Sequence, residues 1–451
     1  MSTLMVSVSG IRGIIGSGLD PNVLVKYTSA FADFIGKGSV VVGRDARITG
    51  EMVQEIVTGT LLAKGINVIE IGIVPTPTVQ YTVKKLKAQG GIAISASHNP
   101  NEWNALKLLN STGQFLTPEE NETLKKLSDN TCENYKAWDK LGKRKKYDDA
   151  LKKHVEDVLK LKYIDTAKIK RRKFMVLVDC VNGAGVYVIP DLLKKFGCKV
   201  IEMNCQKNGI FPRLPEPIPE NLTLTMNAVK KVKADIGIVV DPDVDRLVLI
   251  TEKGEPFGEE NTIAQAVKFI LSKKKGNVVV NLSTTRAVDD IARDAGAVVY
   301  RSPVGEANVV KKMKEVKAII GGEGSGGVIY PALHFGRDAL VGIAITLQHL
   351  TEFKRKMSEL KDSLPQYYIT KKKIELGNTN PDEVIEKLVQ KYGDEKCNTD
   401  DGLRIDFLNH WVHFRKSNTE PIIRIILEGK SQKETEVLME KYLDDIQKLL
   451  K

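Results

Sequence analysis

The sequence has no apolar run near the ~20 residues that a helix needs to cross a bilayer, and its first residues lack the basic and apolar regions of a signal peptide. Its five cysteines are scattered, without a C-x-x-C pair, which indicates reduced thiols rather than a disulfide framework or a zinc site. Aromatic residues make up only 6% of the chain, and the most basic stretch, residues 143–173, lacks the interleaved aromatic side chains of a single-strand binder. We therefore expect a cytoplasmic protein that binds neither membranes nor nucleic acid.

Basic residues are in excess. The 68 lysines and arginines outnumber the 57 aspartates and glutamates, which gives a net charge of +11. Such an excess attracts nucleic acid or a phosphorylated small molecule, or it belongs to a lysine-rich solvated surface. In residues 143–173 the charges alternate with a helical apolar pattern, which favours the solvated surface.

A strand–helix–glycine–strand pattern, typical of a βαβ unit, occurs three times. The glycine before each second strand suits a left-handed helix C-cap. The strand pairs are Val40–Gly43 with Ile66–Ile71, Met175–Val178 with Lys199–Met203, and Val278–Asn281 with Ala297–Tyr300. From about Lys371 the pattern changes to antiparallel hairpins with helices, which indicates a small α+β domain.

We predict an α/β protein with three similar βαβ-type domains, each with a mixed sheet, and a small C-terminal α+β domain, all around a central cleft. The expected domains are residues 1–145, 146–253, 254–366 and 367–451. A further strand in each of the first three ends in a polar or glycine-rich loop: SASHNP, DPDVDR and GEGSGG. Ligands bind beyond the carboxyl ends of strands in open α/β sheets, so these loops are the candidate functional loops.

The loop DPDVDR places three carboxylates at alternating positions after an apolar strand: Asp241, Asp243 and Asp245. Carboxylates this close repel one another unless a cation neutralises them, and hard oxygen ligands favour Mg²⁺. An Asp/Pro turn that closes a strand is the alternative. Such a turn does not require three carboxylates followed by Arg246.

Two further loops offer ligands for a sugar and a phosphate. In GGEGSGG, Glu323 and Ser325 can bind vicinal hydroxyls, although the loop also suits a flexible turn. The segment RKSNTEPIIR combines guanidinium groups with hydroxyls, which suits a phosphate dianion, although an ordinary hairpin turn is the alternative. Its candidate ligands are Arg415, Ser417, Asn418, Thr419 and Arg424.

The stretch GIAISASHNP ends a buried strand with Ser97, His98 and Asn99. A serine beside a metal site and a phosphate cradle can hold or pass a phosphoryl group, since that transfer depends on positioning and charge neutralisation. A simple cap or turn serine is the alternative, but it gives His98 and Asn99 no role.

These four loops, in this order, resemble those of the α-D-phosphohexomutase family, which includes phosphoglucomutase, phosphomannomutase and phosphoglucosamine mutase. The resemblance covers essentially the whole chain. SASHNP is similar to the phosphoserine loop, DPDVDR to the metal loop, GEGSGG to the sugar loop and RKSNTEP to the phosphate loop. The resemblance implies an isomerase that interconverts hexose 6-phosphate and hexose 1-phosphate through phospho-Ser97 and a hexose 1,6-bisphosphate. Phosphoglucosamine mutase is the favoured activity, with phosphoglucomutase or phosphomannomutase as the alternative.

The resemblance also implies a role for each candidate residue. One Mg²⁺ per chain would be held by the three aspartates and a phosphoserine oxygen of Ser97. The expected catalytic residues are Ser97, His98, Lys107, Arg12 and Arg246. The expected substrate-binding residues are Glu323, Ser325, Arg415, Ser417, Asn418, Thr419 and Arg424. The expected partner is a phosphorylated hexose, and the protein is expected to be a monomer or a homodimer.

The chain departs from the family pattern at Gly327, where many relatives have histidine, and at Pro242, where many have glycine. A general-base role for that histidine therefore does not carry over, and His334 is the nearest candidate to replace it. Two other classes fit parts of the sequence. A strand followed by Asp-x-Asp also suits an aspartate-nucleophile sugar phosphatase, which leaves Ser97 unexplained. The net charge suits a non-catalytic sugar-phosphate binder.

Overall fold

The computed structural model describes residues 3–7, 10–130, 134–377, 379–416 and 422–450. The chain divides into two compact units. The first comprises Met1–Thr262 and Ser325–Lys361, and the second comprises Ile263–Gly324 and Asp362–Lys451. In these described ranges, no helix is both long and apolar enough to cross a membrane.

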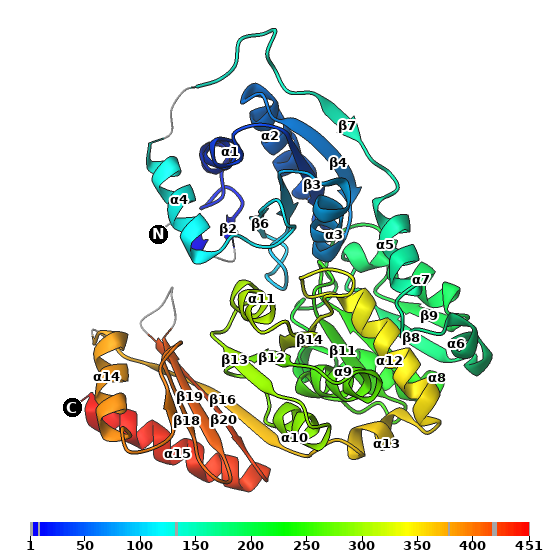
Figure 1. Cartoon of the computed structure of the whole chain (residues 1–451), viewed down its shortest axis with the longest axis vertical. Coiled ribbons are helices and arrows are strands. Elements are labelled where there is room, and N and C mark those ends of the chain that lie inside the picture. Colours follow the sequence, from blue (N-terminus) through cyan, green and yellow to red (C-terminus); the bar gives the residue numbers. More distant parts are fainter. Residues whose placement is uncertain (1–2, 8–9, 131–133, 378, 417–421, 451) are drawn as a thin grey trace. The chain divides into compact units, whose positions relative to one another are not determined.

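The first unit begins with a seven-stranded mixed sheet in the order β1-β2-β6-β5-β3-β4-β7. Strand β3 is parallel to β4 and β5, whereas β6 is antiparallel to β5 and β2. Its strands are β1 (Met5–Ser7), β2 (Gly10–Ile14), β3 (Ser39–Arg44), β4 (Asn67–Ile73), β5 (Gly90–Ile94), β6 (Trp103–Leu109) and β7 (Arg144–Lys146). Its helices are α1 (Pro21–Ile35), α2 (Gly50–Ala63), α3 (Thr76–Leu86) and α4 (Pro118–Asp129), drawn in blue to cyan in Figure 1.

A second, four-stranded sheet of the first unit has the order β11-β10-β8-β9. Strand β10 is parallel to β8 and antiparallel to β11, so the chain reverses at the end of β10. Its strands are β8 (Met175–Asp179), β9 (Lys199–Met203), β10 (Ile236–Val240) and β11 (Leu247–Thr251). The neighbouring elements are α5 (Ala150–Leu159), α6 (Thr166–Arg172), η1 (Ala184–Tyr187), α7 (Ile189–Lys195), η2 (Pro219–Asn221) and α8 (Thr223–Val232). The unit also contains β15 (Gly327–Ile329), α12 (Ala339–Phe353) and most of α13 (Met357–Asp362).

The second unit contains a third parallel arrangement and the C-terminal sheet. Strand β12 is parallel to β13 and β14. The elements of this part are α9 (Glu259–Lys273), which starts in the first unit, β12 (Val278–Asn281), α10 (Ala287–Asp294), β13 (Val299–Ser302), α11 (Glu306–Glu315) and β14 (Ile320–Glu323).

The C-terminal sheet is antiparallel in the order β16-β20-β19-β18-β17. Helix α15 packs along β16 and β20, and α14 packs on β18 and β19 (Figure 1). The elements are β16 (Tyr368–Glu375), α14 (Pro381–Lys391), β17 (Cys397–Asn398), β18 (Leu403–Asp406), β19 (Trp411–Lys416), β20 (Ile422–Gly429) and α15 (Gln432–Leu449).

The predicted fold class is confirmed: three similar α/β arrangements, of which the first two have the mixed sheets described above, are followed by a smaller α+β domain. The expected strand pairs correspond to β3 with β4, β8 with β9, and β12 with β13. The glycines before the second strands, Gly65, Gly197 and Gly296, have φ values of 79°, 73° and 62°. They therefore adopt the left-handed cap geometry that the sequence indicated.

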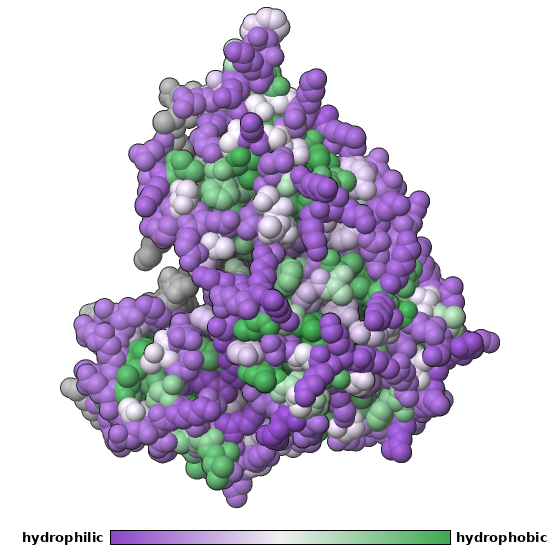
Figure 2. All heavy atoms as spheres, viewed as in Figure 1, coloured by the Kyte–Doolittle hydropathy of each residue, from purple (hydrophilic) through white to green (hydrophobic). Residues whose placement is uncertain are grey.

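The visible surface carries many hydrophilic side chains, with small apolar areas between them (Figure 2). The exposed residues 143–146 of the basic stretch lie in β7 and the segment before it. This agrees with the interpretation of the excess positive charge as a solvated surface.

Candidate active site

Ser97 lies in the loop that follows β5. Its φ of 49° is a left-handed conformation, uncommon for a residue with a side chain. The Ser97 hydroxyl donates a hydrogen bond to Asp241 Oδ2 at 2.8 Å. The two residues are 144 positions apart in the chain, and both are buried. The structure therefore brings the candidate phosphoserine to the candidate metal loop.

A buried arginine holds the Ser97 loop. Arg47 Nη2 donates to the carbonyl oxygens of Ser97 and Asn99, both at 2.7 Å. Its Nε donates to Asp45 Oδ2 at 3.1 Å, and the same oxygen accepts a bond from Ser95 Oγ at 2.7 Å. Neither Arg47 nor Asp45 was among the candidates from the sequence. Nothing in the segment GRDAR, residues 43–47, indicates that Arg47 donates hydrogen bonds to carbonyl groups about 50 residues further along the chain.

Asp241, Asp243 and Asp245 form a fully buried carboxylate cluster between β10 and β11. One oxygen atom of each lies within 4.8 Å of those of the others. Val244 has a φ of 64°, a strained conformation for a β-branched residue. The Oδ1 atoms of Asp243 and Asp245 accept no hydrogen bond from any described residue. These oxygens fit a hard divalent cation such as Mg²⁺, which takes carboxylate ligands.

Cationic side chains from distant elements contact this cluster. On β6, Lys107 Nζ donates to Asp243 Oδ2 at 2.6 Å and lies 3.9 Å from Asp245 Oδ2. Arg337 Nη2 donates to Asp245 Oδ2 at 2.6 Å. Lys107 was expected near the reacting group, whereas Arg337 was not. Both reduce the repulsion among three buried carboxylates.

Burial and charge separate the pKa values within the cluster. Burial raises the pKa of Asp241 well above its usual value, and the Asp245 and Asp243 carboxylates add to the rise. Burial acts in the same direction on Asp243. There the Lys107 ammonium, together with hydrogen bonds from Lys107 and Thr76, outweighs burial and lowers the pKa. A divalent cation bound to the cluster would favour the ionised form of Asp241, whose pKa burial raises.

The other expected catalytic arginines lie in the same unit. Arg12, on β2, donates from Nη1 to Asn99 Oδ1 at 2.6 Å. The backbone N–H of Arg246 donates to Asp241 Oδ1 at 3.2 Å. The Nε atom of the Arg246 side chain is 4.0 Å from Asp245 Oδ1. The Ser97 loop and the acidic loop therefore each have an arginine beside them.

His98 is close to the serine hydroxyl, with its Nδ1 atom 3.4 Å from Ser97 Oγ. Burial lowers the pKa of His98 to about 2, and the positive charges of Arg246 and Arg12 act in the same direction. The imidazole is therefore neutral at neutral pH, and His98 contributes a hydrogen-bonding group rather than a charge.

The space beside Gly327 is filled by Arg337. A Cβ atom on Gly327 would lie 2.3 Å from Arg337 Cδ. A side chain at position 327 would thus displace the arginine that pairs with Asp245. The structure explains why this chain has glycine at position 327 instead of the histidine of many relatives. Without a side chain there, Arg337 has room to reach Asp245 in the acidic loop.

His334 lies in a buried cluster with His154 and Asp338. The Nε2 atoms of His334 and His154 are 3.1 Å and 2.8 Å from Asp338 Oδ2. The His154 Nδ1 atom is 2.9 Å from Thr78 Oγ1. Asp338 also caps α12 by accepting a bond from the Leu340 N–H. These contacts give His334 a structural role between helices.

The two expected sugar-binding residues, Glu323 and Ser325, belong to different units of the chain. Glu323, at the end of β14 in the second unit, accepts hydrogen bonds at Oε1 from Asn281 Nδ2 and the Gly305 N–H, both at 2.9 Å. Ser325 belongs to the first unit and is half-buried.

The expected phosphate residues lie on the C-terminal sheet of the second unit. Arg415 on β19 is directly opposite Arg424 on β20, which in turn is opposite Lys373 on β16. Residues directly opposite one another share a face of the sheet, and like charges there repel unless an anion is bound. Lys373 was not among the candidates. Ser417, Asn418 and Thr419 lie outside the described residues.

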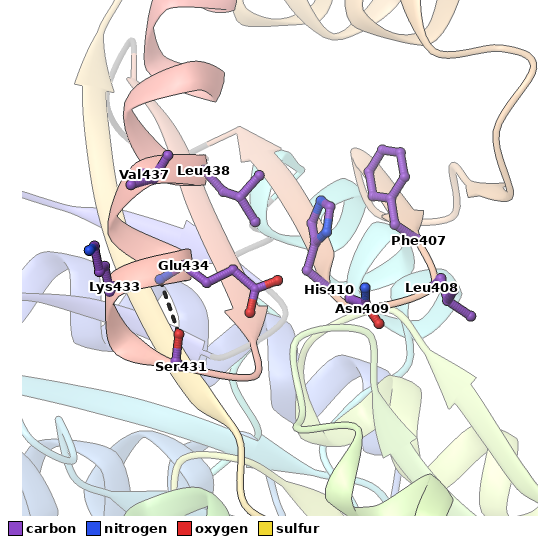
Figure 3. Close-up of a pocket in the computed structure, with 9 residues that line it drawn as sticks. All are labelled: Phe407, Leu408, Asn409, His410, Ser431, Lys433, Glu434, Val437 and Leu438. Carbon is purple, nitrogen blue, oxygen red and sulfur yellow. Dashed lines mark hydrogen bonds between the residues drawn. The ribbon is translucent and has the colours of Figure 1, made fainter.

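A separate pocket in the C-terminal domain lies between the start of α15 and the β18–β19 connection (Figure 3). Much of its lining is apolar. The lining residues are Phe407, Leu408, Asn409, His410, Ser431, Lys433, Glu434, Val437 and Leu438. The sequence-predicted site residues are not part of this lining, so the pocket does not contribute to the candidate active site.

A serine loop joined to an acidic triad, on a chain of three α/β arrangements and a smaller α+β domain, is typical of a class of phosphoryl-transfer protein, and comparison with known proteins agrees with this class. Residues 4–134, 152–254 and 259–368 match the alpha/beta/alpha domains I, II and III of phosphoglucomutase/phosphomannomutase, and residues 372–444 match its C-terminal domain. The chain belongs to the phosphoglucomutase/phosphomannomutase family.

Similar proteins carry two kinds of name. A "Phosphoglucomutase/phosphomannomutase" of Thermococcus kodakarensis is 37% identical over 451 residues, covering 98% of both chains. A "Probable phosphoglucosamine mutase" of Methanopyrus kandleri is 34% identical over 446 residues, covering 98% of this chain and 97% of the other. A crystal structure of a phosphoglucomutase/phosphomannomutase family protein from Burkholderia thailandensis aligns with a TM-score of 0.86 at 25% identity, over 99% of this chain and 98% of that one.

Proposed function

We propose that this protein is a phosphohexomutase that interconverts hexose 6-phosphate and hexose 1-phosphate, with glucosamine phosphate as the preferred substrate. The observation that carries this proposal is the 2.8 Å contact between Ser97 Oγ and Asp241. In this contact the Ser97 hydroxyl lies against a carboxylate cluster that can hold a cation, which supports Ser97 as the proposed carrier of the phosphoryl group. The four domains are proposed to be residues 1–145, 146–253, 254–366 and 367–451.

The proposed reaction consists of two phosphoryl transfers. In the first, the bond between phosphorus and Ser97 Oγ breaks, and a bond forms between phosphorus and the free hydroxyl oxygen of the sugar phosphate. The product is a hexose 1,6-bisphosphate, and the hydroxyl proton passes to Ser97 Oγ or to a base. In the second, the bond between the other phosphorus and its sugar oxygen breaks, a bond forms between that phosphorus and Ser97 Oγ, and the sugar oxygen takes up a proton in place of the one that Ser97 loses. The isomeric sugar phosphate is released.

Charge neutralisation is the main task of the residues around Ser97. Mg²⁺ held by Asp241, Asp243, Asp245 and an oxygen of phospho-Ser97 would neutralise charge on the transferring group. Lys107, Arg12 and Arg246 would act in the same way, and His98 would stay neutral and hydrogen-bond. The substrate would be bound by Glu323, Ser325, Arg415, Ser417, Asn418, Thr419 and Arg424.

The preference for glucosamine phosphate is supported by the glycine-rich sugar loop and by the names of several similar proteins. Phosphoglucomutase or phosphomannomutase activity is the alternative, because another similar protein carries that name. Parallel assays with the 6-phosphates of glucosamine, glucose and mannose decide between them. The proposal requires the highest kcat/KM for glucosamine 6-phosphate.

Mass spectrometry of the purified protein tests the chemistry. The mutase requires a single phosphate on Ser97, gained on incubation with a hexose 1,6-bisphosphate. Phosphate on Asp241 would indicate an aspartate-nucleophile phosphatase. No phosphate on any residue after that incubation would indicate a non-catalytic binder.

A further inference from the structure

Arg415, the expected phosphate ligand, is held by a carboxylate that no sequence motif singled out. Asp401 Oδ2 accepts a hydrogen bond from Arg415 Nε at 2.8 Å. A guanidinium that donates through Nε can still present its two Nη groups to a phosphate in bidentate geometry. The contact therefore fixes the direction of the side chain without preventing phosphate binding.

Asp401 has a second set of partners on the segment that precedes α11. The same Oδ2 atom accepts a bond from the Val304 N–H at 2.9 Å. The next N–H along the chain, that of Gly305, donates to Glu323 Oε1 at 2.9 Å. Two consecutive amides thus hold the two carboxylates, one beside the phosphate-binding arginine and the other on the sugar loop.

A second series of hydrogen bonds, through His413, Ser283 and Asn281, connects Asp401 with Glu323. His413 Nε2 donates to the Asp401 carbonyl oxygen at 2.7 Å, and its Nδ1 atom is 2.9 Å from Ser283 Oγ. The Ser283 N–H donates to Asn281 Oδ1 at 2.9 Å. Asn281 Nδ2 in turn donates to Glu323 Oε1 at 2.9 Å.

The charges around Arg415 explain why a carboxylate is needed here. Arg415, Arg424 and Lys373 stand side by side on three adjacent strands. Without a counter-charge they would repel one another. Asp401 neutralises only part of this charge, which leaves net positive charge for a phosphate. The Asp401 and Arg415 side chains are 23% and 20% exposed, so solvent reaches part of the pair, and the bond to Nε restricts the orientation of the guanidinium group.

We propose that Asp401 is a positioning residue that aims the Arg415 guanidinium at the non-reacting phosphate and ties it to the sugar-loop carboxylate Glu323. The inference rests on the proposed function for the identity of the ligand, a hexose phosphate. It assigns a role to a residue outside the four loops, and it couples phosphate recognition to hydroxyl recognition within one unit of the chain.

The first test compares Asp401→Ala and Asp401→Asn with Asp400→Asn, a neighbouring exposed aspartate. Asp401→Ala should raise KM for glucosamine 6-phosphate about tenfold. The loss of one well-oriented hydrogen bond between Arg415 and the phosphate changes affinity by about this factor. The kcat value should change much less. Asp401→Asn keeps an acceptor for Nε and should fall between. Asp400→Asn should match the unmodified protein, and equal KM values for all four proteins would overturn the proposal.

A double-mutant cycle tests whether Asp401 acts through Arg415. In an Arg415→Ala background, Asp401→Ala should add little to the loss of affinity. If its penalty is the same in both backgrounds, Asp401 does not act through the arginine and the proposal is wrong. Thermal unfolding identifies a variant that fails to fold. If Asp401→Ala fails, Asp401→Asn replaces it in the cycle, both alone and combined with Arg415→Ala.

Calorimetric titration with glucosamine 6-phosphate separates this inference from the proposed function, because it requires no turnover. Weaker binding by Asp401→Ala than by Asp400→Asn supports the positioning role even if the unmodified protein shows no mutase activity. Turnover by the unmodified protein with unchanged binding by Asp401→Ala would leave the mutase standing and overturn the positioning role.

Discussion

The Ser97 hydroxyl and the Asp241 carboxylate, 144 residues apart in the chain, are joined by a 2.8 Å hydrogen bond. Ser97 lies in a left-handed turn after β5, and Asp241 directly follows the buried strand β10. Left-handed backbone in non-glycine residues is costly and is typical of functional sites. This contact is the basis of the proposed phosphoryl transfer.

Replacing Ser97 by alanine should abolish hexose phosphate interconversion, because it removes the hydroxyl that lies against Asp241. We expect no turnover above a level about a thousandfold below that of the unmodified protein, while calorimetry still detects hexose phosphate binding. Ser111→Ala, at an exposed position, is the matched control. Retained turnover in Ser97→Ala would remove Ser97 from the mechanism.

Removal of divalent cations should lower both activity and the thermal midpoint, because the three buried carboxylates lose their neutralising ion. At a Mg²⁺ concentration about a hundred times the dissociation constant, binding adds ~2.7 kcal/mol to the free energy of unfolding. Thermal unfolding with EDTA and with Mg²⁺ measures this difference. It should shrink in Asp241→Asn, and an undiminished shift in that variant would place the ion elsewhere.

Gly327→Ala should disturb the acidic loop, since its Cβ atom would lie 2.3 Å from Arg337 Cδ. Overpacking of this kind typically costs ~1–3 kcal/mol, and displacement of Arg337 from Asp245 should lower kcat/KM as well. In an Arg337→Ala background the same change meets no Cδ atom and should cost less. Urea unfolding of the four proteins gives the comparison; an equal cost in both backgrounds would contradict this explanation of Gly327.

Arg47→Ala should destabilise the protein more than most single substitutions. It leaves the Asp45 carboxylate buried without its cation and removes donors from the Ser97 loop. Breaking one side of a buried ion pair typically costs ~3–5 kcal/mol. Denaturant unfolding measures the loss. Arg44→Ala, which removes a half-buried arginine whose Nε has no hydrogen-bond partner among the described residues, should cost clearly less.

The free energy of unfolding should fall with decreasing pH partly because of His413. Burial lowers the pKa of His413 from 6.5 to about 4. The unfolded chain therefore takes up this proton near pH 6.5 and the folded chain only near pH 4, so the unfolded state gains stability as the pH drops through that window. Each unit of pH in the window costs at most ~1.4 kcal/mol for this one group. In His413→Asn the slope of unfolding free energy against pH should be smaller between these values and unchanged above pH 7.

Much of the fold was predictable because its signals are local. The apolar runs of β3, β8 and β12 and the glycines before the paired strands depend only on neighbouring residues. The acidic residues of DPDVDR were recognisable for the same reason: three carboxylates within five positions, directly after an apolar strand, require a charge partner when they are buried.

Arg47, Arg337 and Asp401 were not predictable in this way. Each acts on residues far away in the sequence: Arg47 on the Ser97 loop, Arg337 on Asp245, and Asp401 on Arg415. An isolated arginine or aspartate in a loop has no periodicity that distinguishes it from a solvated surface residue. Its partner depends on the order and register of the strands that surround it.

By itself, the sequence determined which segments form strands and helices and which loops carry serine, carboxylate and basic side chains, because turn chemistry and hydrophobic periodicity act over a few residues. The tertiary structure alone decided which of these groups meet. Strand order and backbone reversals after β5 and β10 bring Ser97 to Asp241, and only a packed structure could show that the absent side chain at Gly327 makes room for Arg337.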